Sequence, residues 1–176
     1  MIEKMTRRIG RRYVAVSLAL VLAVGAFMLA VYAPRFSSAA NGYPYLETKL
    51  GYTPADLFDM AEGYGEAGRR LYIRTALSLD LLLPLLAGNL IASAALYLSK
   101  RRKGGESLRR PAFAIGVAVC LSDWMENFCM IGLLSLYPEQ CMPIAIAARI
   151  MTTVKYVLML LAALLILREL RLPKAC

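Results

Sequence analysis

The sequence of 176 residues contains no histidine. Histidine is the commonest metal ligand, and its side chain is the one that ordinarily titrates nearest neutral pH. The chain therefore has no side chain of this kind for either role. The four cysteines, Cys120, Cys129, Cys141 and Cys176, include no pair at CxxC spacing. These absences argue against a zinc site and against a dithiol redox centre. We expect neither a metal nor a cofactor.

The chain also lacks a P-loop, a dinucleotide-binding glycine pattern and a nucleophile elbow. Acidic residues are few, since 12 Asp and Glu stand against 21 Lys and Arg, for a net charge of +9. On a soluble fold, such an excess would suggest nucleic-acid binding. Here the basic residues adjoin long apolar blocks, a pattern typical of membrane orientation signals. We therefore expect no nucleic-acid partner.

What the chain has in abundance is apolar sequence. Apolar residues make up 59% of it and the mean hydropathy is +0.55, whereas soluble domains usually contain about 45–50% apolar residues. The pattern predicts one all-α integral membrane domain over residues 1–176, a four-helix bundle. Its predicted spans cover residues 13–33, 71–98, 112–136 and 144–167. The first apolar block exceeds the roughly 7–15 residues of a signal-peptide core, so we favour an uncleaved span.

The longest polar connection, residues 34–70, is predicted to form an outer loop with a cap. Thr53, Pro54 and Asp56 have the spacing of a helix start, in which Thr53 caps and Asp56 completes an acidic capping box. They predict a short interfacial helix from Pro54 to about Glu62. This cap either covers the bundle without a ligand role or forms a lid over a site.

Charge predicts the orientation. The N-terminus, the basic loop at 99–111 and the C-terminal tail together carry fourteen Lys or Arg and three acids. The connections 34–70 and 137–143 carry four basic and six acidic residues. The positive-inside rule then places both termini in the cytoplasm, and we expect a multi-pass protein of a bacterial inner membrane.

Several polar residues lie within the predicted spans. Asp123, Glu126 and Asn127 are spaced i, i+3 and i+4, so they project from one side of a helix. Ionisable groups at membrane depth normally face a bundle interior or a wet cavity. Asp80 lies four residues before Pro84, which removes a backbone donor and should bend the helix. Counted along each helix, these groups and two from the fourth span, Thr153 and Lys155, reach similar depths, roughly 13–20 Å from the outer end.

This coincidence of depth predicts a buried polar site. The candidates for acid–base roles are Asp80, Asp123 and Glu126. The candidates for ligand binding are Asn127, Thr153, Lys155, Tyr156 and Trp124. The alternatives are that the acids and Lys155 only fix helix register, and that Trp124 and Tyr156 are core residues. Gly88 and Gly132 are expected to permit close helix contacts.

Three functions fit such a site. The first is a cavity for a small amphiphilic or lipid-soluble molecule, including isomerisation or hydrolysis by acid–base chemistry if the protein is an enzyme. The second is a proton-coupled transporter or channel subunit, which predicts a continuous wet path and a homo-oligomer. The third is a structural or accessory subunit. The residues do not decide among them.

Five motifs run through the chain: GYTPxDLF from Gly51, YGExGRRLY from Tyr64, LDxxxPL from Leu79, DxxEN from Asp123 and TxK from Thr153. On these motifs rests a resemblance to a bacterial family of uncharacterised four-span integral membrane proteins. It extends from the outer loop to the last span and implies a four-helix membrane bundle without a defined activity. The family usually has an aliphatic pair where this chain has Trp124 and Met125, a difference expected to change cavity size.

Overall fold

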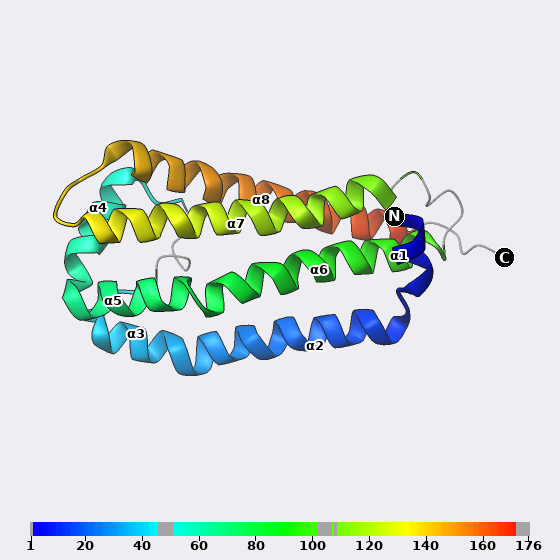
Figure 1. Cartoon of the computed structure of the whole chain (residues 1–176), viewed down its shortest axis with the longest axis horizontal. Coiled ribbons are helices and arrows are strands. Elements are labelled where there is room, and N and C mark those ends of the chain that lie inside the picture. Colours follow the sequence, from blue (N-terminus) through cyan, green and yellow to red (C-terminus); the bar gives the residue numbers. More distant parts are fainter. Residues whose placement is uncertain (1, 46–50, 102–106, 108, 172–176) are drawn as a thin grey trace. The chain divides into compact units, whose positions relative to one another are not determined.

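The computed structural model describes residues 2–45, 51–101, 107 and 109–171, within which the regular secondary structure is helical. The predicted all-α fold is confirmed (Figure 1). The helices are α1 (Ile2–Arg8), α2 (Arg11–Phe27), the π-helix η1 (Met28–Tyr32), α3 (Ala33–Ala39), α4 (Pro54–Gly63), α5 (Gly65–Ala76), α6 (Leu79–Ser99), α7 (Arg109–Leu136) and α8 (Met142–Arg171).

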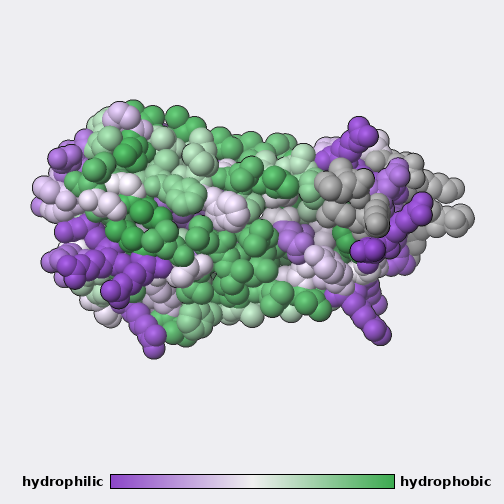
Figure 2. Space-filling view, in the orientation of Figure 1, coloured by the Kyte–Doolittle hydropathy of each residue, from purple (hydrophilic) through white to green (hydrophobic). Residues whose placement is uncertain are grey.

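Four helical stretches are long and apolar enough to cross a membrane. They are Arg11–Ala39, Gly65–Ser99, Arg109–Leu136 and Met142–Arg171. The shortest has 28 residues, or about 42 Å of helix, which exceeds the roughly 30 Å hydrocarbon core of a bilayer. Their exposed surfaces carry many large apolar side chains (Figure 2). The chain thus has the helices of a multi-pass membrane protein.

The helices extend beyond the predicted boundaries. The first span begins at Arg11 and continues through η1 and α3 to Ala39, so the outer connection is shorter than residues 34–70. The second begins at Gly65 and is interrupted at Leu77 and Ser78, upstream of the predicted bend at Pro84. Parts of the predicted outer loop (46–50), inner loop (102–106 and 108) and tail (172–176) lie outside the described residues.

The helix start at Thr53 is confirmed. Thr53 Oγ1 accepts from the Asp56 backbone N–H at 3.2 Å, and an Asp56 carboxylate oxygen accepts from the Thr53 N–H at 2.7 Å. The helix then runs from Pro54 to Gly63, one residue beyond the predicted end. Gly65 has a φ of +61°, a left-handed conformation that favours glycine, where the chain turns into α5.

The chain divides into two compact units. Unit 1 contains Met1–Leu22, Leu83–Ser122 and Val154–Cys176, and unit 2 contains Ala23–Leu82 and Asp123–Thr153. Each unit is described by itself below.

Unit 2 has an aromatic core. The ring of Phe36 lies with its centroid 4.9–6.1 Å from the rings of Tyr32, Tyr45, Tyr64 and Tyr72, mostly in edge-to-face contact. Phe36 and Tyr64 are fully buried. Such pairs contribute about 0.5–1.5 kcal/mol each beyond their buried area. The cluster therefore fixes Tyr45, and the connection that carries it, against α3 and α5.

Unit 1 has a close contact between α6 and α7. A Cβ added at Gly88 would lie 2.4 Å from the Gly116 carbonyl oxygen, and one added at Gly116 would lie 2.6 Å from the Gly88 oxygen. Only glycine permits this approach at both positions, as expected for Gly88. At Gly132 an added Cβ would make only an ordinary contact, 3.7 Å from Ile144, so no close approach requires that glycine.

Candidate functional site

The polar site in unit 2 begins with the backbone of Asp80. In a regular helix the Asp80 carbonyl would accept from the N–H of residue 84, but that residue is proline and has none. Asn127 replaces the missing donor, because its Nδ2 donates to the Asp80 carbonyl oxygen at 3.1 Å. Both residues are buried. The bond joins α6 to α7 at the position where Pro84 disrupts the helical ladder.

The Asp80 side chain has a partner from the residues that follow α3. Tyr45 O–H donates a hydrogen bond to Asp80 Oδ2, and the pair is buried. The aromatic cluster around Phe36 holds the Tyr45 ring in place. This carboxyl therefore lies beneath a tyrosine that the connection supplies.

A second carboxyl lies one residue before Asn127. Glu126 is 2% exposed, and its Oε1 lies 2.5 Å from Thr152 Oγ1 on α8. The Tyr52 hydroxyl is hydrogen-bonded to the same Thr152 oxygen. A hydrogen-bond chain thus runs from Tyr52 through Thr152 to Glu126. We call these contacts, with those of Asp80 and Asn127, the carboxyl network.

Thr152 can serve Glu126 in either of two proton arrangements. Its single hydroxyl proton can go to Glu126 Oε1 or to the Ala148 carbonyl oxygen, which lies 3.0 Å away. In the first arrangement Thr152 stabilises an ionised carboxylate. In the second the Glu126 carboxyl carries the proton and donates it to Thr152. The same geometry therefore accommodates Glu126 with and without a proton, as an acid–base group requires.

The Asn127 side chain gives the network a buried acceptor. Asn127 is 1% exposed, and its Oδ1 has no hydrogen-bond partner in the part of the chain that the structure describes. The bond from Nδ2 to the Asp80 carbonyl fixes the orientation of the amide. Leaving a buried acceptor unsatisfied costs about 1–3 kcal/mol, so this oxygen is suited to a donor from a ligand.

The structure brings three of the predicted residues, Asp80, Glu126 and Asn127, into the network. Trp124 lies close to it in the fold, since its Nε1 donates to the Leu81 carbonyl oxygen at 3.0 Å. Asp123 is half-buried on α7, one turn before Asn127. Their predicted roles in catalysis or binding stay predictions.

Thr153 is not part of the network, which corrects the predicted position. Its side chain is exposed and its hydroxyl donates back to the Arg149 carbonyl at 3.0 Å. The neighbouring Thr152 occupies the buried position instead. Lys155 and Tyr156 belong to unit 1, where the buried Lys155 ammonium lies 5.6 Å from the centroid of the half-exposed Tyr156 ring.

Sequence reasoning missed three members of the network. Tyr45 and Tyr52 look like ordinary boundary aromatics, and nothing in their spacing shows that their hydroxyls reach buried partners. Thr152 could have been found, because it lies seven residues after the buried Ala145 and four after the buried Ala148. That spacing marks the buried stripe of α8 and distinguishes Thr152 from Thr153.

Within the described residues, no group of three or more Cys, Asp or Glu side chains could hold a metal ion. The chain offers two buried carboxyls, each hydrogen-bonded to a hydroxyl, and the buried amide of Asn127, which donates to the Asp80 backbone and follows Glu126 in the sequence. No protein-family model, curated protein or solved structure matches this chain.

Proposed function

We propose that this membrane protein binds a small amphiphilic or lipid-soluble molecule at the carboxyl network and exchanges a proton with it. The observation that carries the proposal is the burial of two carboxyls, Asp80 and Glu126. Asn127 relates them, because it donates to the Asp80 backbone carbonyl and directly follows Glu126 in α7. Burial of such groups is costly in a membrane protein, and it usually indicates a ligand or ion site.

Each residue of the network has a distinct part in this proposal. Glu126 gives or takes the proton, since Thr152 can support both of its states. Asn127 Oδ1 accepts a hydrogen bond from a hydroxyl or amine of the ligand. Tyr45 covers Asp80 in the absence of the ligand and is displaced when a ligand donor takes its place. The apolar part of the ligand would enter from the surrounding lipid.

The same proposal includes the orientation of the chain in the membrane and its location in a bacterial inner membrane. The charge asymmetry supports a bacterial inner-membrane protein with both termini in the cytoplasm. The carboxyl network would then lie toward the outer leaflet, beneath the connection that holds Tyr45 and Tyr52. Membership of the four-span membrane family, which rests on the motifs quoted above, is also part of this proposal.

The test is retention of a native small molecule. The protein would be extracted from its own membrane into nanodiscs and examined by native mass spectrometry, alongside Asp80→Asn and Glu126→Gln. Asp59→Asn is the matched control, because Asp59 is an exposed acid of α4. We expect a bound mass in the wild type and the control that is lost in the other two variants. Equal retention in all four proteins would refute the proposal.

A proton-relay function has a specific observation in its favour. The chain from Tyr52 through Thr152 to Glu126 consists of successive hydroxyl hydrogen bonds, the arrangement along which protons move. This alternative predicts proton uptake by protein-containing vesicles in response to a pH gradient, and loss of that uptake in Tyr52→Phe. If the vesicles take up no protons, the ligand-binding proposal is the better explanation of the network.

A further inference from the structure

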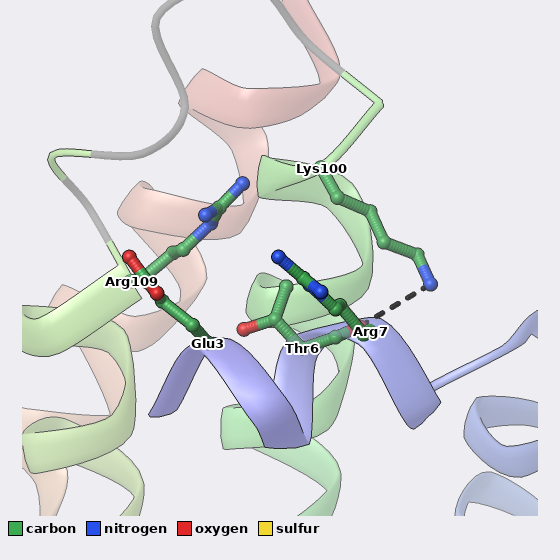
Figure 3. Close-up of a pocket in the computed structure, with 5 residues that line it drawn as sticks. All are labelled: Glu3, Thr6, Arg7, Lys100 and Arg109. Atoms are coloured by element: carbon green, nitrogen blue, oxygen red, sulfur yellow. Dashed lines mark hydrogen bonds between the residues drawn. The ribbon is translucent and has the colours of Figure 1, made fainter. Parts of the chain in front are cut away.

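A second polar feature lies in unit 1, at the basic ends of the spans. A cavity of about 290 Å³ is lined by Glu3, Thr6, Arg7, Lys100 and Arg109. Figure 3 shows that they come from three places: α1, the residue that follows α6, and the first residue of α7. None of them belongs to the carboxyl network.

The cavity wall is built by specific contacts. Lys100 Nζ donates to the Ile9 carbonyl oxygen, and it also donates to the Thr6 carbonyl oxygen at 3.4 Å. Thr6 and Ile9 are 3% and 7% exposed. These contacts hold the C-terminal end of α1, where backbone carbonyls lack helical donors, against the end of α6. Arg7 is therefore presented from an anchored helix.

The charge of the lining selects an anion. Among the described residues, the lining has three cations and one carboxylate, a net charge of +2. Guanidinium groups present several N–H donors in a planar fork that suits phosphate oxygens. A water molecule occupies about 30 Å³ in the liquid, so the cavity has room for a phosphate group and the start of its ester.

The position in the chain agrees with this chemistry. Lys100 directly follows one candidate span and Arg109 begins the next. Residues at the ends of spans lie at the level of lipid headgroups, where basic pockets take up anionic ones. We propose that the cavity formed by Arg7, Lys100 and Arg109 binds the phosphate of an anionic phosphate ester, either a lipid headgroup or a soluble compound.

The test compares two double variants. Each arginine replaced in one is adjacent in the sequence to an arginine replaced in the other. Arg7→Gln with Arg109→Gln removes two cations from the cavity, whereas Arg8→Gln with Arg110→Gln removes two exposed cations that do not line it. Each protein in neutral detergent would be titrated with short-chain phosphatidylglycerol, with phosphatidylcholine of the same chains and with inorganic phosphate. Native mass spectrometry would give the affinities.

We expect the cavity pair to weaken phosphatidylglycerol binding by roughly tenfold or more, and the control pair to change it much less. Glu3→Gln, which removes an acid of the lining, should strengthen phosphatidylglycerol binding. Binding of phosphatidylglycerol but not of inorganic phosphate would identify the ligand as a lipid headgroup. Binding of both would identify it as a soluble phosphate ester. Equal losses in the two arginine pairs, or equal binding of phosphatidylcholine, would overturn the proposal. If the cavity pair does not fold, Arg7→Gln alone provides the comparison, because its side chain is exposed.

Discussion

At the scale of single residues, the site depends on the way Pro84 and Asn127 complement each other. Pro84 leaves the Asp80 carbonyl without its helical donor, and Asn127 supplies one from another helix. The amide nitrogen is thereby committed to a structural bond. Its oxygen is left for other uses.

Asn127→Leu should destabilise the protein by about 1–3 kcal/mol, because it leaves a buried carbonyl without a donor. In a Pro84→Ala background the same change should cost less, since residue 84 then has an N–H for the Asp80 carbonyl. Thermal unfolding of the four proteins in detergent, followed by circular dichroism, would measure this coupling. Strictly additive losses would show that the two residues act independently.

Thr152 and Thr153 form a natural pair for a second test. Thr152→Val should cost about 1 kcal/mol, because it removes the hydroxyl between Tyr52 and Glu126. Thr153→Val should change the stability by less than about 0.5 kcal/mol, since Thr153 is exposed and bonds only to its own helix. Equal costs, again from thermal unfolding, would contradict the assignment of Thr152 to the network.

These residues show how far the sequence can be taken. Glu126 and Asn127 lie three and four residues after Asp123, and this helical spacing predicted that both project from one side of the helix. Counting along the helices predicted that Asp80 lies at a similar depth. Neighbouring residues of a helix point about 100° apart, so depth alone could not choose between Thr152 and Thr153. The tyrosines were beyond prediction because a loop's path is set by the core on which it packs.

At the scale of elements, the close approach of α6 and α7 depends on Gly88 and Gly116. The backbone of each helix occupies the space that a side chain on the other would need. Small residues at such crossings allow dispersion contacts and weak Cα–H hydrogen bonds, which are important where lipid replaces water.

Gly88→Ala should destabilise the protein by about 1–3 kcal/mol, because the new methyl group collides with the Gly116 carbonyl. Gly25→Ala is the matched control in α2, where an added Cβ meets nothing within 4 Å. It should be neutral or slightly stabilising, since alanine favours a helix. Unfolding by increasing fractions of denaturing detergent would compare them, and a loss in Gly25→Ala as large as in Gly88→Ala would contradict the reading.

At the scale of the whole molecule, the all-α fold and the four candidate spans could be predicted from the composition and from the lengths of the apolar blocks. The span ends could not, because polar and basic residues continue a helix past the hydrocarbon without interrupting its hydrogen bonds. Arg109 and Arg171 are both helical for this reason.

Topology can be tested with single cysteines in a cysteine-free background. Asp59→Cys should react with a membrane-impermeant maleimide on intact cells, because Asp59 is exposed on α4, which the proposed orientation places outside. Arg8→Cys, exposed at the basic end, should react only after permeabilisation. Reaction of both in intact cells would contradict the proposed orientation.

Infrared difference spectroscopy tests the central claim most directly, by following the carboxyl C=O stretch as the copurified molecule is removed and restored. We expect a band that changes in the wild type, and that is lost in Glu126→Gln and retained in Asp59→Asn. A wild-type spectrum without carboxyl changes would contradict the claim that this network works on a ligand, and would leave its acids with a purely structural role.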